Sequence, residues 1–266
     1  MTTEYSGAGD PKRSVELLWG VQPRPRRGPR PRLTAADIVT TAIAVADADG
    51  LDALSMRRIA ETLGVAPMSI YTYVPGKSEL IDLMLDRAYG ELDPSGGDHD
   101  GPGGGEQAGW RERLERIARD HWELFHRHPW MLQVATGRPP LGPNLLDKYE
   151  RELRAVDGLG LGDLEMDSVV ALVTGFAESS ARTSVNAARA EQRTGMSDRQ
   201  WWEAVAPVLQ ELVDPARYPL GTRVGAVAGQ EHGAAFGPGH AFEFGLERVL
   251  DGIGALIDSR DGPGAS

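Results

Sequence analysis

Apolar residues recur at steps of three and four along most of this chain, the spacing that places them on one face of a helix. The first clear stripe contains Ile38, Ala42 and Ala46. Thr34 precedes it as an N-cap, with an acidic residue three positions later, as in a capping box. No stretch alternates apolar and polar residues convincingly enough to predict a β-strand. The pattern therefore predicts an all-α protein whose first regular helix ends near Gly50.

Capping residues and helix breakers divide the rest of the chain into further helices. Ser55 caps a helix that Gly64 ends, and Pro67 opens the next one. Ser78 is expected to cap another. The pattern predicts helices over 55–63, 67–73, 78–92, 110–128, 143–156, 166–189, 197–213 and 238–258.

Two stretches rich in Gly and Pro separate these helices into domains. Residues 23–31 read PRPRRGPRP, which cannot form a helix because each proline restricts itself and its predecessor. Residues 93–109 lack apolar periodicity and are expected to form a loop. The predicted organisation is a flexible basic arm (1–32), a helix-turn-helix domain with a connecting helix (33–92), the Gly-rich loop (93–109), a ligand-binding and dimerisation domain (110–260) and a disordered tail (261–266).

The run from Ser55 to Val74 has the layout of a helix-turn-helix, whose second helix enters the major groove of DNA. A small apolar wedge is expected to fix the angle between its helices: Ile59, Ala60, Leu63, Val65 and Ile70. The outward positions offer hydroxyls and apolar surface: Pro67, Met68, Ser69, Thr72 and Tyr73. Arg57 is placed to pair with a guanine and Lys77 to contact a phosphate. Taken alone, the same spacing is equally compatible with ordinary helix packing.

Residues 55–85, SMRRIAETLGVAPMSIYTYVPGKSELIDLML, closely resemble the DNA-binding segment of the tetracycline-repressor family. The matching positions are Ser55, Arg57, Ile59, Ala60, Leu63, Gly64, Val65, Ile70, Tyr71, Val74, Lys77 and Leu80. The resemblance implies that bases or the flanking backbone are contacted by Arg57, Pro67, Met68, Ser69 and Thr72. It implies that phosphates are held by Tyr71, Tyr73 and Lys77. Many relatives carry other residues at Thr72 and Tyr73, so no operator sequence is carried over.

The formal net charge of −11 is unusual for a DNA-binding protein, but the charge is unevenly distributed. Residues 1–32 carry seven basic and three acidic side chains. Arginines on a flexible arm can reach a minor groove; alternatively, the arm adds only non-specific attraction to DNA. Within the arm, Leu17, Leu18 and Trp19 either dock on the protein or form an exposed turn.

Residues 110–156, with the element His128-Pro129-Trp130, resemble the ligand-binding domain of the same family. An apolar cavity with few polar groups is expected to bind a small-molecule effector. Its expected lining is Trp122, Phe125, His126, Trp130, Met131, Tyr149, Phe176, Ser180 and Thr183. For each of these residues, a place in an ordinary core is the alternative. His121, His126 and His128 do not align on one helical face, so no metal site is expected.

Two downstream helices, 166–189 and 238–258, carry broad apolar surfaces. The resemblance implies that these helices of two subunits form a four-helix dimer interface; the alternative is that both are inner helices of a monomer. The expected interface residues are Val169, Val173, Phe242, Leu246, Val249, Ile253 and Leu256. A two-fold homodimer would match a palindromic operator.

Other classes of protein are disfavoured by the features that the sequence lacks. Without cysteine, a GxSxG elbow, an HExxH motif or a P-loop, neither an enzyme nor a cofactor is expected. No apolar run reaches about 18 residues and no signal-peptide order is present, which predicts a cytoplasmic protein without a membrane partner. We expect a repressor that binds double-stranded operator DNA and is released by an effector when helix 78–92 moves. The alternative is a DNA-binding protein that senses no ligand.

Overall fold

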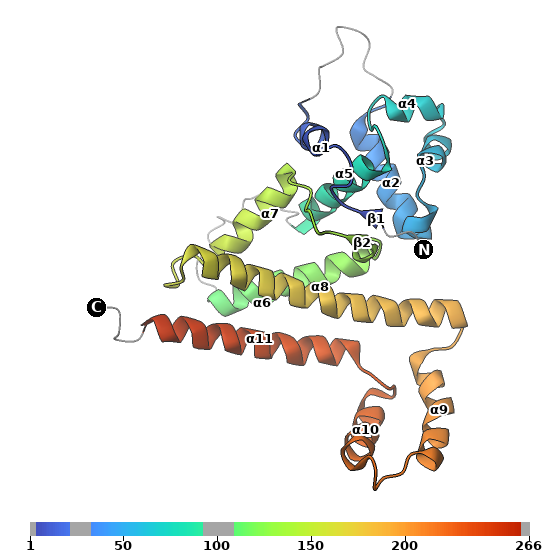
Figure 1. Cartoon of the computed structure of the whole chain (residues 1–266), viewed down its shortest axis with the longest axis vertical. Coiled ribbons are helices and arrows are strands. Elements are labelled where there is room, and N and C mark those ends of the chain that lie inside the picture. The colour runs from blue at the N-terminus through green and yellow to red at the C-terminus, as the bar shows by residue number, and fades with distance from the viewer. Residues whose placement is uncertain (1–3, 22–32, 93–108, 262–266) are drawn as a thin grey trace.

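A computed structural model describes residues 4–21, 33–92 and 109–261 of the chain (Figure 1). Within these ranges the helices are α1 Pro11–Leu18, α2 Ala35–Asp49, α3 Met56–Leu63, α4 Pro67–Tyr71, α5 Lys77–Tyr89, α6 Trp110–Arg127, α7 Pro143–Arg154, α8 Asp163–Thr194, α9 Asp198–Leu212, α10 Pro219–His232 and α11 Pro238–Asp261. Short 3₁₀ turns cover Leu51–Ala53, Gly90–Leu92 and Met131–Gln133. Strands β1 (Glu4–Tyr5) and β2 (Val134–Ala135) pair in parallel. The predicted all-α class is confirmed.

Helices α2 to α5 form the first compact unit, and capping side chains define where its helices begin and end. Thr34 Oγ1 accepts the Asp37 amide while the Asp37 carboxylate accepts the Thr34 amide, so the predicted capping box is present. Ser55 Oγ accepts the Arg58 amide at 3.2 Å at the start of α3. Gly64 ends α3 at φ 66°, a left-handed conformation that favours glycine.

Two hydrophobic cores hold the chain together. The first fills the α2–α5 unit around Ile38, Ile59 and Leu80 and continues to Phe125 and Trp130 at the end of α6. The second core lies between α6, α8 and α11, and Figure 1 shows α11 running alongside α8. Because the first core crosses from α5 to α6, the two halves of the molecule are joined by buried apolar contacts.

The structure corrects the predicted N-terminal arm. Residues 11–18 form α1, which packs on α5, where a flexible segment was expected. Leu17 and Leu18 are buried, and the half-exposed Trp19 donates its indole N–H to the Leu141 carbonyl at 2.9 Å. These three residues therefore dock on the protein. The proline-rich run 23–31, residues 93–108 of the loop and residues 262–266 of the tail lie outside the described residues.

Other helices also differ from the predicted pattern. Gly76 is the N-cap of α5, so Ser78, the predicted cap, lies in its first turn. The pattern did not predict α10. Together, α9 and α10 form an arm that projects from the rest of the chain (Figure 1). Its outward apolar side chains, between 47% and 76% exposed, are Trp201, Val208, Leu212, Tyr218, Leu220, Val224 and Val227.

Candidate DNA interface and effector domain

The wedge between α3 and α4 is built as the sequence predicts. Ile59, Ala60 and Ile70 are completely buried, and Leu63 and Val65 pack against the same core. Pro67 occupies the first turn of α4, where a missing amide costs no hydrogen bond. The wedge therefore fixes α4 across α3 and leaves the opposite side of α4 free.

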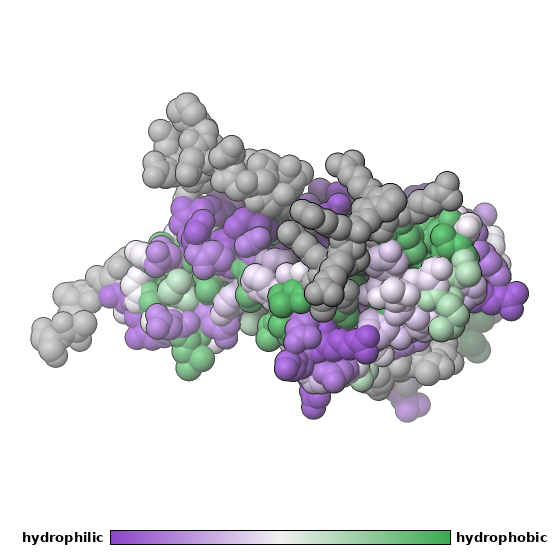
Figure 2. Space-filling model, turned by 90° about the horizontal axis from the view of Figure 1, so that it is seen from above, coloured by the Kyte–Doolittle hydropathy of each residue, from purple (hydrophilic) through white to green (hydrophobic). Residues whose placement is uncertain are grey.

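The free side of α4 carries most of the predicted base-contacting residues. Met68 is 74% exposed, although it is a large apolar side chain, and Pro67, Tyr71 and Thr72 are also exposed while Ser69 is half-buried. Figure 2 looks onto this end of the molecule and shows hydrophobic surface beside hydrophilic surface. A mixed surface of this kind suits base edges and the thymine methyl group.

Arg57 and Ser55 lie on the adjoining end of α3. Arg57 extends into solvent and pairs with Glu61 at 2.8 Å one turn later, an exposed contact that a nucleic acid can displace. Ser55 serves as the N-cap of α3, so its hydroxyl is already engaged by a backbone amide. Of these two residues, only Arg57 has a side chain that forms no hydrogen bond with the backbone.

Two of the predicted phosphate contacts have other surroundings than expected. Tyr73 is half-buried and packs against the first core, whereas the sequence analysis placed it outward. The Lys77 ammonium group forms an ion pair with Glu4 at 2.8 Å. Sequence reasoning missed Glu4, because no local pattern links residue 4 to residue 77.

The His128-Pro129-Trp130 element joins the α6 end to the DNA-binding unit. Trp130 is fully buried and donates its indole N–H to Asp47 Oδ1 of α2 at 2.9 Å. His128 Nδ1 lies 2.8 Å from the same oxygen, and its Nε2 lies 3.1 Å from Glu91 Oε2. The element is therefore a polar junction inside the first core, where Trp130 is completely buried.

The connecting helix α5 carries a buried acidic face. Asp82 is 1% exposed, and Asp86 is also buried one turn further on. Burial raises the pKa of both carboxyl groups, although hydrogen bonds from Gly7 and Ser14 to Asp82 oppose the shift. Asp86 accepts the Leu145 amide at 3.0 Å, which ties the start of α7 to α5. The two carboxylates thus fix the position of α5 against neighbouring segments.

A buried polar cluster lies between α5, α6 and α7. His121 Nε2 lies 2.7 Å from Glu152 Oε1, and the Lys148 ammonium group donates to Glu152 Oε2 at 2.8 Å. Burial lowers the pKa of His121, while the pKa of Glu152 is lowered by its hydrogen bonds from His121 and Lys148, which outweigh burial. Lys148 also lies 5.5 Å from the centre of the Tyr89 ring. The sequence indicated only the spacing of Lys148 and Glu152, one helical turn apart.

The predicted effector residues separate into three groups. Trp122 stacks on Phe242 at 4.3 Å between ring centres, and Phe176 lies 5.9 Å from the same ring. His126 joins this group through Trp122, and its Nε2 lies 2.9 Å from Ser184. Phe125, Trp130 and Met131 instead belong to the first core. The third group lies at the surface. Tyr149, whose hydroxyl donates a hydrogen bond to Asp167, and Thr183 are exposed, and Ser180 is half-buried.

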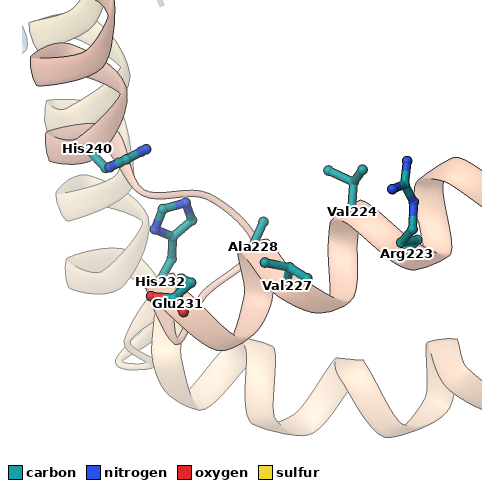
Figure 3. Close-up of a pocket in the computed structure, with 7 residues that line it drawn as sticks. All are labelled: Arg223, Val224, Val227, Ala228, Glu231, His232 and His240. Atoms are coloured by element: carbon teal, nitrogen blue, oxygen red, sulfur yellow. The ribbon is translucent and has the colours of Figure 1, made fainter.

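Two surface hollows lie beside α11, and the predicted effector residues line neither of them. The first, about 650 Å³, lies between α10 and the start of α11 (Figure 3). There Val224, Val227 and His232 of α10 face His240 of α11, with the two imidazole rings 5.2 Å apart. The second, about 520 Å³, lies between α8 and α11 and is lined by apolar residues that include Leu164 and Leu172.

Most of the predicted dimer residues point into their own chain. Five of them are completely or nearly completely buried in the second core: Val169, Val173, Phe242, Leu246 and Ile253. Val249 and Leu256 are half-buried and line the second hollow. This corrects the prediction, because the widest apolar face of α11 packs on α6 and α8 of the same subunit. The outer face of these helices carries Leu164, Leu172 and Phe244, all exposed.

Two family models match the chain. Residues 38–84 match the bacterial regulatory proteins of the tetR family, and residues 102–257, more than half of the chain, match the tetracyclin repressor-like C-terminal domain. The chain belongs to the TetR family. The first match covers the α3–α4 wedge and the recognition face, and the second covers the effector domain with its polar cluster. Because TetR proteins are transcriptional regulators, the chain is a DNA-binding regulator and not an enzyme.

Individual TetR relatives extend over most of the chain. The HTH-type transcriptional repressor DrrR1 of Streptomyces coeruleorubidus is 43% identical over 99% of this chain and 93% of its own length. The structure of ActR from Streptomyces coelicolor in complex with actinorhodin is 27% identical, with a TM-score of 0.68, and covers 84% of this chain and 96% of its own. ActR in complex with (S)-DNPA is 26% identical with a TM-score of 0.65, covering 85% and 98%.

No helix in the described ranges of this TetR protein is long and apolar enough to cross a bilayer.

Proposed function

We propose that this TetR protein is a repressor that binds a palindromic operator as a homodimer and releases it when a small-molecule effector binds. The observation that carries the proposal is the uncovered face of α4. A wedge whose Ile59, Ala60 and Ile70 are completely buried holds α4 in place, while Met68, Tyr71 and Thr72 remain exposed. Large apolar and aromatic side chains are rarely left exposed together on a rigid short helix unless they have a binding partner.

Homodimerisation is supported by the outer face of α8 and α11. Leu164, Leu172 and Phe244 are each more than half exposed, and the two leucines line the 520 Å³ hollow. A self-complementary apolar face is what a two-fold interface buries. Two recognition helices related by that axis would match half-sites about 34–36 Å apart. Binding to a chromosomal operator would place the protein in the cytoplasm.

Effector binding is supported by the ring stack next to the buried polar cluster. Trp122, Phe176 and Phe242 supply flat apolar surface, and His121, the neighbour of Trp122 on α6, supplies polar groups together with Glu152 of α7. An effector site combines these two kinds of surface. The ActR structures, solved with actinorhodin and with (S)-DNPA, support a small organic effector for this chain as well. A direct test is a melting-temperature screen of small molecules, because a ligand that binds only the folded state raises that temperature.

The test of DNA binding is to sequence the chromosomal fragments that the purified protein retains and to measure affinity for them against random competitor. We expect Lys77→Ala to weaken binding to all duplexes and to reduce the salt slope by about 0.9 per lysine. Arg57→Ala should in addition relax the sequence preference. Arg154→Ala, an exposed pair with Glu150 on α7, is the matched control and should change neither property.

Equal effects of Arg57→Ala and Lys77→Ala on sequence preference would contradict this division of roles. Wild-type protein that prefers no duplex over random competitor would contradict the proposed function itself. A DNA-binding protein without effector control is the remaining alternative. It would be supported if ligands that stabilise the fold left operator affinity unchanged, because effector and operator binding must influence each other reciprocally.

A further inference from the structure

Residues 4–19, here called the N-terminal strap, bind to the loop that precedes α7. The Ser6 amide donates to the Ala135 carbonyl at 3.1 Å, continuing the β1–β2 pairing, and the Ser6 hydroxyl donates to the Arg138 carbonyl at 2.6 Å. At the other end of the strap, Trp19 donates to the Leu141 carbonyl at 2.9 Å. The strap is therefore anchored on the effector half of the molecule at both of its ends.

The middle of the strap forms hydrogen bonds with α5. Asp82, 1% exposed, accepts the Gly7 amide at 2.9 Å and the Ser14 hydroxyl at 3.0 Å. Both hydrogen bonds come from the strap, so Asp82 keeps these partners only while the strap is docked. Gly9 lies so close to Glu79 that a side chain there would collide with the carboxylate. These contacts are specific, and they connect the strap to the helix that leads from the recognition helix to the effector domain.

Glu4, the first residue of the strap, pairs with a lysine that is also a proposed DNA contact. Its carboxylate lies 2.8 Å from the Lys77 ammonium group at the start of α5. Lys77 is also the lysine proposed above to hold a DNA phosphate. A carboxylate beside this lysine both neutralises it and repels an approaching phosphate. Strap and DNA therefore compete for one side chain.

We propose that the N-terminal strap is an intramolecular competitor of DNA: docked, it withholds Lys77, and duplex binding displaces Glu4 from it. The inference rests on the proposed DNA-binding function and deepens it. Because the strap is anchored on residues 135–141, its docking links the effector half directly to a phosphate contact. Linkage requires that DNA loosen the strap by the same factor as the strap weakens DNA binding.

The test uses full-length protein and a random-sequence duplex, since phosphate contacts do not depend on sequence. Glu4→Gln keeps the size of the side chain and removes its charge. We expect it to tighten binding about two- to fivefold, the range of an ion pair near the protein surface. Glu16→Gln is the matched control: it removes one negative charge from the same strap, at a residue that pairs with Lys12 and not with Lys77, and should leave the affinity unchanged.

The double variant separates competition for Lys77 from a general charge effect. In a Lys77→Ala background, Glu4→Gln should give no gain in affinity. Hydrogen exchange provides a second readout: saturating duplex should speed exchange at the Ser6 and Gly7 amides. The inference is overturned if Glu4→Gln binds as wild type or more weakly, if the gain persists without Lys77, or if duplex leaves strap exchange unchanged. Wild-type protein that binds no duplex at all would overturn the proposed function, and the inference with it.

Discussion

The polar junction between α2 and the α6 end can be tested by Asp47→Ala. One oxygen of Asp47 receives the Trp130 indole N–H at 2.9 Å and lies 2.8 Å from His128 Nδ1. Trp130 is completely buried and His128 is 4% exposed, so both lose a partner, while Asp47 itself is exposed and lets water reach the vacated position, which keeps the cost toward the lower end of its range. A buried donor left without a partner costs about 1–3 kcal/mol. With two such groups, we expect the free energy of unfolding to fall by roughly 2–4 kcal/mol.

The measurement is urea unfolding followed by far-UV circular dichroism and by tryptophan fluorescence. For a chain of this size a loss of 2–4 kcal/mol corresponds to a fall in melting temperature of about 4–12 °C. Asp49→Ala is the control, because Asp49 lies on the same helix but pairs with exposed Arg58, a contact worth about 0–1 kcal/mol. If the two alanine variants lost the same stability, the junction could not be a buried hydrogen-bonded site.

Two further predictions concern the buried histidine and the outer face of α8. Because burial lowers the pKa of His121 below its ordinary 6.5, the unfolded chain takes up this proton first as pH falls, and stability is lost below about pH 6.5. His121→Gln should therefore flatten the pH dependence of the urea midpoint between pH 7 and 5.5, whereas exposed His240→Gln should not; identical profiles would refute this. Leu172→Glu should convert the proposed dimer to a monomer, which light scattering detects as a halved mass in solution. The buried neighbour is the control: Val173→Ala should lower the free energy of unfolding by about 1–3 kcal/mol and leave the mass in solution unchanged. An unchanged mass for Leu172→Glu would remove this face from the interface.

The DNA-binding unit could be predicted from the sequence because its determinants are local. Thr34 and Ser55 cap helices within three residues of themselves, and Gly64 ends α3 by its own backbone freedom. The α3–α4 wedge is also local, since Ile59 and Ile70 are only 11 positions apart, on two helices joined by a short turn. Such short-range rules place α2, α3 and α4 without reference to the rest of the protein.

Helices α1 and α10 could not be predicted in the same way. Helix α1 has eight residues, and it docks through Ser14, whose partner Asp82 is 68 positions away. Only tertiary contacts of this kind favour a helix that short. Helix α10 contains Gly221, Gly225 and Gly229, which weaken a helical pattern, and its apolar residues face outward without marking a core stripe.

The dimer and effector residues could not be placed from the sequence for a different reason. A broad apolar stripe, such as that of α11, shows that the helix is covered but not by which neighbour. In this chain Phe242 and Ile253 are covered by their own subunit. Lys148 and Glu152 have the spacing of an ordinary surface pair, and only His121, 31 positions before Glu152, makes them part of a buried cluster.

The contacts along α5 explain how one helix could transmit the proposed effector signal. Its start carries Lys77, its middle carries Asp82 beneath the N-terminal strap, and its end places Tyr89 beside the buried polar cluster. Thirteen helical residues span about 20 Å, so α5 acts as a rigid rod between the cluster and the recognition helices. Asp86 holds the start of α7 through the Leu145 amide. An effector that shifts α7 would therefore pull on α5 at Asp86 and change the spacing of the two recognition helices in a dimer. Both carboxylate anchors are buried, so such a shift must exchange one set of hydrogen bonds for another, which favours two discrete positions over a continuum.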